Sequence, residues 1–199
     1  MSENRQEQST KMEEYKMLRE ELNDAMKTQD SLINICLTSV TAVLAFAFSQ
    51  HLSVILLAAY PIIYFLLCKF IRHRERVVHI SGYLIVYLEP IIGFTWETHN
   101  YIAYTKENKQ VSQLFWETPH YHFWEALAFM TLCASILIDC LNHPTVILIT
   151  VVQYIIHFVA IIVIHRSSVT LAKASELRKE KVQYWTMVKN NISEDNSNS

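Results

Sequence analysis

The chain has 199 residues, of which 51% are hydrophobic and two are glycine, so we expect a mostly helical protein with few tight turns. The formal net charge of −2 at pH 7 argues against general nucleic-acid binding, although a local basic patch is compatible with that charge. The four cysteines lie in apolar runs without a C-x-x-C pair, which indicates neither a disulfide framework nor a zinc site, and we expect no cofactor.

The N-terminal arm, residues 1–30, contains the segment STKMEEYKMLREELNDAMKT, which predicts an amphipathic helix at 9–28. Apolar side chains recur along it at heptad spacing: Tyr15, Leu18, Leu22 and Ala25. Acidic residues occupy the opposite side of this helix. Because the repeat is too short for a coiled coil alone, we expect the arm to pack on other helices of this chain or of neighbouring subunits.

Four long apolar segments follow the arm, at 32–49, 52–71, 123–141 and 145–165. A helix of roughly 20 residues crosses a hydrocarbon layer about 30 Å thick, and the first and third segments only just meet this length. The alternative, a soluble protein with a very apolar core, leaves too little polar surface to cover four such segments. We therefore predict an all-α integral membrane protein with four transmembrane helices, arranged as two hairpins at 31–71 and 123–165.

The basic residues predict how the chain is oriented. Lys and Arg follow the second segment, in KFIRHRER, and the fourth segment, whereas the short connections at 50–51 and 142–144 contain none of the seventeen. By the positive-inside rule both termini and the central insertion are then cytoplasmic. We expect a multi-pass protein of the cell inner (plasma) membrane.

The central insertion, 72–122, and the C-terminal region, 166–199, are predicted to be cytoplasmic and largely helical. RERVVHISGYLIVYLEP predicts a helix that ends at Glu89, because Pro90 is expected to stop it. Gly93 marks a turn, and WETHNYIAYTKEN predicts a second short helix. The region after 166 predicts a basic amphipathic helix that ends in a disordered tail, ISEDNSNS.

The pattern W-E-T-x-x-Y occurs twice, as WETHNY and WETPHY. We interpret its rings as packing wedges at the membrane interface, where the ring is apolar and its polar atom stays wet. The predicted interfacial aromatic residues are Trp96, Trp116, Tyr121 and Trp124. For Trp96, packing on the arms is the other option.

A metal-binding site is the more specific interpretation of the segment that contains the two W-E-T copies. His120 and His122 form an H-x-H pair, with acidic residues and His99 nearby in the sequence, but the spacing matches no known zinc site. No phosphate-binding loop, nucleophile elbow or H-E-x-x-H motif is present in the sequence. We therefore predict no metal ligand and no catalytic residue, and we do not expect an enzyme.

Polar and small residues recur at three- and four-residue spacing inside the apolar segments, and so lie on single helix faces. The sets are Ser31, Asn34, Thr38, Thr41 and Ala45; Ala128, Thr131 and Ser135; and Thr150, Gln153, His157 and Ala160. One interpretation is helix packing, in which each hydrogen bond contributes about 0.6–2 kcal/mol. The other is a hydrated path between several copies, because one four-helix bundle fills its own middle. The pore-lining candidates are Asn34, Thr38, Thr41, Gln153 and His157.

A basic cluster follows the second apolar segment, formed by Arg72, His73, Arg74, Arg76 and His79. Its ordinary role is to anchor the topology on anionic lipid. The alternative is that it binds an anionic ligand, such as the phosphate groups of a nucleotide or an oligonucleotide.

The arm EEYKMLREEL at 13–22, the insertion YLEPIIGFTWET at 87–98 and the four-segment layout resemble a group of small bacterial membrane proteins. Within that group, the chain resembles the membrane channel effector of Hailong-type anti-phage defence. The resemblance covers most of the chain and implies a tetrameric channel with a nucleotidyltransferase as its system partner. It also implies a ligand, a short single-stranded DNA that holds the channel shut, but it assigns no ligand-binding residue here.

Three functions are compatible with these features. The first is a homo-oligomeric channel or permeabilising effector in antiviral defence, gated from the cytoplasm by a nucleotide or a single-stranded DNA oligomer. The second is a passive membrane anchor or scaffold, and the third is a metal-dependent membrane enzyme. We favour the first.

Overall fold

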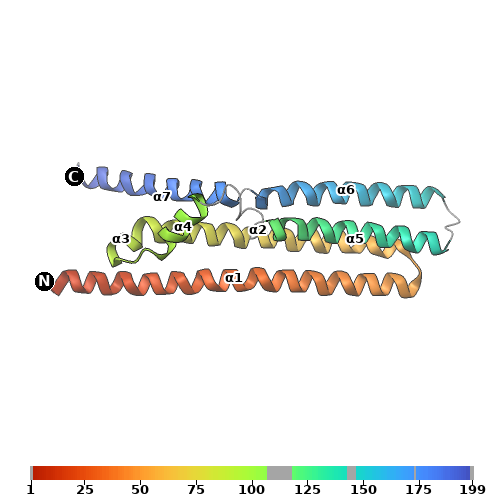
Figure 1. Cartoon of the computed structure of the whole chain (residues 1–199), viewed down its shortest axis with the longest axis horizontal. Helices are drawn as coiled ribbons and strands as arrows, with labels where there is room; N and C mark the ends of the chain where they lie inside the picture. Colours follow the sequence, from red (N-terminus) through yellow and green to blue (C-terminus); the bar gives the residue numbers. More distant parts are fainter. Residues whose placement is uncertain (1, 107–117, 143–146, 173, 198–199) are drawn as a thin grey trace. The chain divides into compact units, whose positions relative to one another are not determined.

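The computed structural model describes residues 2–106, 118–142, 147–172 and 174–197, and nearly all of them are helical (Figure 1). The helices are α1 (Ser2–Gln50), the 3₁₀ turn η1 (Ser53–Ala58), α2 (Ala59–Tyr83), the π-helical turn η2 (Leu84–Leu88), α3 (Glu89–Ile92), α4 (Trp96–Lys106), α5 (Thr118–Asn142), α6 (Ile147–Ala172) and α7 (Ala174–Ser197). These ranges contain no β-strand, which confirms the predicted all-α class for the part of the chain that the structure describes.

Among the described residues, four helices are long and apolar enough to cross a membrane, as predicted from the sequence. They contain the apolar parts of α1, α2, α5 and α6, and their outward faces carry large apolar side chains. Phe46, Phe65, Phe129 and Phe158, one from each of these helices, are between 56% and 65% exposed. Apolar surface of this extent is unfavourable in water and is expected of helices that face lipid. These observations are compatible with a multi-pass membrane protein.

The chain forms two compact units, which are described separately. The membrane unit consists of Asp30–Ile71 and Trp116–Ala172, and the polar unit consists of Met1–Gln29, Arg72–Phe115 and Lys173–Ser199. Helices α1 and α2 each contribute residues to both units without interruption.

Within the membrane unit, the four apolar helices bury a common core that includes Cys36, Val40, Ile63, Leu67 and Trp124. α5 and α6 pack on each other and on η1. The rings of Phe70 and Trp124 meet edge to face with their centroids 5.7 Å apart. Because Trp124 is completely buried, the prediction that its indole nitrogen stays wet at the interface is wrong.

Within the polar unit, the N-terminal arm packs on α2 and α3. Tyr15, Leu22 and Ala25 are buried and Leu18 is half-buried, so the predicted heptad face is confirmed as a packing face. The buried partners of Tyr15 and Leu22 are Ile80, Leu84, Leu88 and Ile92. The Tyr83 hydroxyl donates to a Glu14 carboxylate oxygen at 2.7 Å, and this hydrogen bond holds the pKa of Glu14 below its ordinary value.

The helix of the insertion does not end at Glu89, as Pro90 led us to expect; it continues to Ile92. Pro90 has no N–H to donate to the carbonyl oxygen of residue 86, and its ring crowds that oxygen. The chain widens into the π-helical turn η2 just before Pro90, and Lys189 Nζ donates to the Val86 carbonyl oxygen at 3.0 Å. A lysine of α7 therefore satisfies the acceptor that the proline leaves open.

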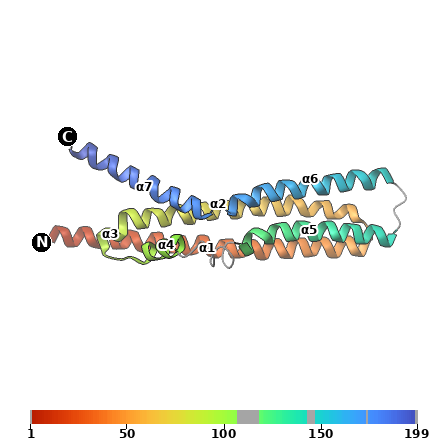
Figure 2. The same ribbon diagram turned by 45° about the horizontal axis from the view of Figure 1, so that its top comes forward.

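Gly93 ends the helix and reverses the chain into α4 (Figure 2). Its φ of 77° lies in the left-handed region, and its N–H donates to the Glu89 carbonyl oxygen at 3.0 Å. α4 confirms the predicted second short helix.

The expected disordered tail is also wrong for most of its length, because α7 continues to Ser197. Once a helix has formed, each further residue adds a hydrogen bond at little cost, even in a polar sequence. Within this stretch, the Ser193 hydroxyl donates to the Asn190 carbonyl oxygen at 2.7 Å. Residues 198–199 lie outside the described residues.

Candidate functional site

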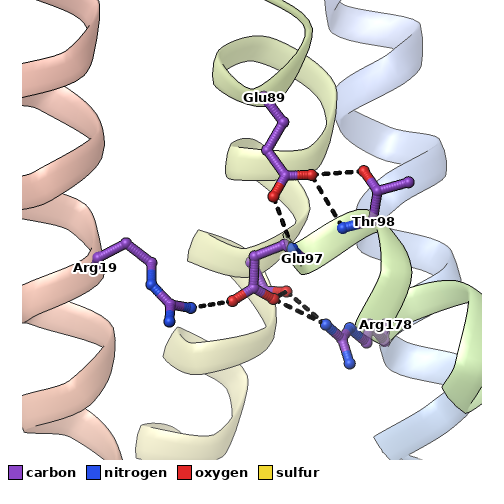
Figure 3. Close-up of polar contacts among 6 residues, drawn as sticks. Arg19, Glu89, Glu97, Thr98 and Arg178 are labelled. Atoms are coloured by element: carbon purple, nitrogen blue, oxygen red, sulfur yellow. Dashed lines mark hydrogen bonds and ion pairs between the residues drawn. The ribbon is translucent and has the colours of Figure 1, made fainter. Parts of the chain in front are cut away.

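Glu97, the acidic residue of the first W-E-T copy, is the centre of a buried polar network in the polar unit (Figure 3). One carboxylate oxygen forms an ion pair with Arg19 of α1. The other accepts hydrogen bonds from Ser81 Oγ of α2 at 2.8 Å and from Arg178 Nη2 of α7 at 3.0 Å. Arg178 Nη2 also donates to Ser81 Oγ, at 2.9 Å. A single carboxylate on α4 thus links α1, α2 and α7.

Glu89 positions Glu97 by capping the N-terminus of α4. Its carboxylate accepts from the N–H of Glu97 at 2.6 Å and from the N–H of Thr98 at 3.0 Å, and from the Thr98 hydroxyl at 2.6 Å. These backbone groups have no partner within the helix, and a carboxylate is favoured at the positive end of the helix dipole. Because Glu89 is itself 2% exposed, the start of α4 is held by a buried anion (Figure 3).

The network places two guanidinium groups around one carboxylate. The side chains of Glu97, Arg178 and Arg19 are 4%, 16% and 25% exposed. Burial lowers the pKa of Arg178, and the opposite charge of Glu97 acts against this shift. A buried ion pair adds little net stability, but removal of one partner costs about 3–5 kcal/mol. We therefore expect the loss of any one member of the network to destabilise the polar unit.

A pocket of about 190 Å³ opens beside Glu97. Ten residues line it: Leu22, Met26, Arg74, Val77, Val78, Ser81, Trp96, Glu97, Asn100 and Arg178. Its walls combine apolar side chains with two arginines, one carboxylate and one carboxamide, which is the composition of a small-ligand site. All of the lining residues belong to the polar unit.

Trp96 lies at this pocket and contacts the N-terminal arm. The Arg19 guanidinium carbon is 4.1 Å from the centroid of the Trp96 ring, within cation–π range, and Trp96 is 54% exposed. Of the two roles considered for this ring, the structure therefore places Trp96 against the arm. Trp116 lies outside the described residues, as does the side chain of Tyr121.

The predicted basic cluster is distributed over several environments, and Arg74 is its member in the pocket. Arg72 is exposed, and Arg76 pairs with Glu21 at 2.6 Å. The His79 ring packs on Trp185, with centroids 4.9 Å apart. Burial and the charge of Lys181 lower the pKa of His79. The Nδ1 atom of half-buried His73 is also buried.

The polar faces predicted inside the apolar segments fall into two classes. Gln153 and His157 of α6 are 5% and 0% exposed within the membrane unit. Gln153 donates to Ser135 Oγ of α5 at 2.8 Å. Asn34, Thr38 and Thr41 of α1 are instead exposed. The Thr38 hydroxyl donates to the Asn34 carbonyl oxygen at 2.9 Å, which satisfies it within the helix.

His157 is held by Tyr60 of α2, whose hydroxyl oxygen is 2.6 Å from His157 Nδ1. The Tyr60 hydroxyl also lies 3.3 Å from the Ala128 carbonyl oxygen. Both contacts are satisfied if His157 carries its proton on Nδ1 and donates to Tyr60, which donates to Ala128. This arrangement favours the packing interpretation for the α6 residues within one protomer.

The described residues contain no group of three His, Cys, Asp or Glu side chains that could hold a metal ion. Glu97 is engaged by two arginines, and His99 Nδ1 contacts the Thr95 carbonyl oxygen at 2.7 Å. His122 lies 3.6 Å from Glu125, in an i,i+3 pair on α5. Glu117 and the side chain of His120 lie outside the described residues.

No protein-family model, no curated protein and no solved structure matches this chain.

Proposed function

We propose that the chain is a homo-oligomeric channel or permeabilising effector of the inner membrane, controlled by its polar unit. The observation that carries this proposal is the exposed polar face of α1. Asn34, Thr38 and Thr41 are all exposed on the protomer, in a helix that is long and apolar enough to cross a membrane. In contrast, Gln153 and His157 of α6 are buried in the membrane unit.

A polar face on a membrane helix needs a polar environment. The carboxamide of Asn34 would be costly against lipid, and such residues in membrane helices face other helices or water. The middle of the membrane unit is filled by its own side chains, including Trp124 and His157. A hydrated path therefore forms between copies, with one α1 helix from each copy lining it; the resemblance adds that the assembly is a tetramer.

The orientation follows from the positive-inside rule, which assigns both termini and residues 72–122 to the cytoplasm, with the spans as two hairpins. A reporter fused after Ser199 or inserted near residue 108 will be active on the cytoplasmic side. A periplasmic reporter at either position would contradict this orientation.

The polar unit is the proposed gate, because α1 is one helix from Ser2 to Gln50. Arg19, on the arm, and Thr38, on the exposed polar face, are parts of this same helix. An event that releases Arg19 from Glu97 is therefore proposed to act on the membrane unit through this shared helix. The resemblance adds a role in anti-phage defence, a nucleotide or single-stranded DNA oligomer as regulator and a nucleotidyltransferase as partner. Within the basic cluster, Arg74 is the candidate phosphate contact, because it lines the pocket beside Glu97.

A passive anchor or scaffold is the second candidate. The hydrogen bonds of Gln153 and His157 favour it, because these polar residues are explained by packing within one protomer. A metal-dependent enzyme has no such supporting observation. The anchor interpretation leaves the exposed face of α1 without a role.

Potassium flux from proteoliposomes separates the two candidates. The triple variant Asn34→Leu, Thr38→Leu and Thr41→Leu removes the polar face. The control, Asn34→Ser, Thr38→Ser and Thr41→Ser, keeps a polar side chain at each of the three positions. Each set is prepared alone and with Glu97→Gln, so that a closed gate does not mask conduction. Channel function predicts flux in the wild-type and serine sets and its loss in the leucine set. Equal flux in all sets, or none in any, would refute the proposal.

A further inference from the structure

The pocket beside Glu97 has a positive polar end. Arg74 and Arg178 both line it, together with the carboxylate of Glu97, which already forms an ion pair with Arg19. The charge of Arg74 contributes to the lowered pKa of Arg178, so the two guanidinium groups are close enough to repel each other. The Glu89 carboxylate accepts hydrogen bonds from the N–H groups of Glu97 and Thr98 at the N-terminus of α4. An anion at this end would reduce the repulsion.

Apart from Ser81 and Asn100, the rest of the pocket is apolar. Leu22, Val77 and Val78 form walls that are buried or half-buried, and Met26 at the rim is 50% exposed. The exposed ring of Trp96 supplies an aromatic face at the same pocket. The volume of about 190 Å³ is enough for one small ring or short chain with an acid group.

We infer that this pocket binds a small organic anion, with its phosphate or carboxylate between Arg74 and Arg178 and its apolar body against Leu22 and Val78. Guanidinium groups bind such acids through paired, charge-assisted hydrogen bonds. The apolar walls add affinity in proportion to the area that the body removes from water.

The bound acid group competes with Glu97 for Arg178. Binding therefore weakens the link between α4 and α7 and leaves Glu97 with Arg19 and Ser81 as its partners. The inference that binding opens a gate rests on the proposed channel function. The inference that the pocket binds a small anion does not.

Calorimetric titration of the full chain in detergent with phenyl phosphate tests the site. We expect one phenyl phosphate per chain, and weaker binding of inorganic phosphate and of phenol, which each lack one half of the ligand. Arg74→Gln should weaken binding by about ten- to a hundredfold, as expected for loss of a charged hydrogen bond. Arg72→Gln, at an exposed arginine two residues away, should change it by less than about twofold, as expected for an exposed charge outside the pocket.

Met26→Trp is a second variant that fills the pocket from its exposed rim and leaves every charge in place. This variant should abolish the binding of phenyl phosphate. The inference is overturned if phenyl phosphate does not bind, if phenol or inorganic phosphate binds equally well, or if Arg74→Gln and Met26→Trp bind like the wild type. Binding without any proteoliposome flux would refute the proposed channel but not the proposed binding site. Flux without binding would refute the binding site but not the channel.

Discussion

Replacement of Glu97 by glutamine tests whether the buried network holds the polar unit together. The amide keeps the size of the side chain but removes the charge that compensates Arg19 and Arg178, and the Arg178 side chain is 16% exposed. Loss of one partner from a buried ion pair costs about 3–5 kcal/mol. We use about 3 kcal/mol, the lower end of this range, because Arg19 is partly solvated. The opening of α4 and α7 should then become roughly a hundredfold more frequent.

Hydrogen exchange of the detergent-solubilised protein measures this opening directly. The amides of α4 and α7 should exchange roughly a hundredfold faster in Glu97→Gln, whereas those of α6 should not change. Glu21→Gln is the matched control, because Glu21 and Arg76 form an exposed pair with side chains 40% and 58% exposed. Such pairs contribute about 0–1 kcal/mol, so exchange should rise at most about fivefold. Equal exchange rates in the two variants would refute the reasoning.

Three further predictions concern packing and pH. Tyr60→Phe removes the partner of buried His157 and should destabilise the membrane unit by about 1–3 kcal/mol in thermal unfolding, while Thr38→Val, on the exposed face of α1, should not. Gly82→Leu should detach α7 from α2 and speed its proteolysis, because even a Cβ there would lie 3.2 Å from Trp185 Cδ1 and 3.3 Å from the Lys181 carbonyl carbon. In the folded protein the pKa of His79 lies below its ordinary value of 6.5, so the stability of the polar unit should fall as the pH drops below about 6.5. His79→Gln should flatten this dependence. An unchanged slope of stability against pH in the variant would contradict the prediction.

The helices and their packing faces could be predicted because their signals are local. Long apolar runs and the heptad positions Tyr15, Leu22 and Ala25 report burial through spacing alone. The wrong prediction that the helix ends before Pro90 has the opposite origin, a contact that is distant in the sequence. The helix continues past Pro90 because a π-helical turn precedes the proline and because Lys189 donates to the Val86 carbonyl oxygen. These two residues are 103 positions apart in the sequence.

The candidate site could not be predicted for a similar reason. Glu97 meets Arg19 and Arg178 across sequence separations of 78 and 81 residues. Each arginine taken alone is typical of the solvated face of an amphipathic helix. The repeated W-E-T pattern did draw attention to Glu97, but it gave no indication that the first copy joins the arms. The spacing of Gln153 and His157 likewise located a polar face and did not indicate whether helices or water meet it.

The selectivity of the conducting path is the most direct test of the central claim that the exposed face of α1 lines it. Thr38→Asp and Thr38→Lys each place a ring of charge there, one charge from every copy, and such rings set the selectivity of channels. Reversal potentials in a KCl gradient should show a higher potassium-to-chloride permeability ratio for Thr38→Asp than for the Thr38→Ser control, and a lower ratio for Thr38→Lys. The same ratio in all three proteins would contradict the account.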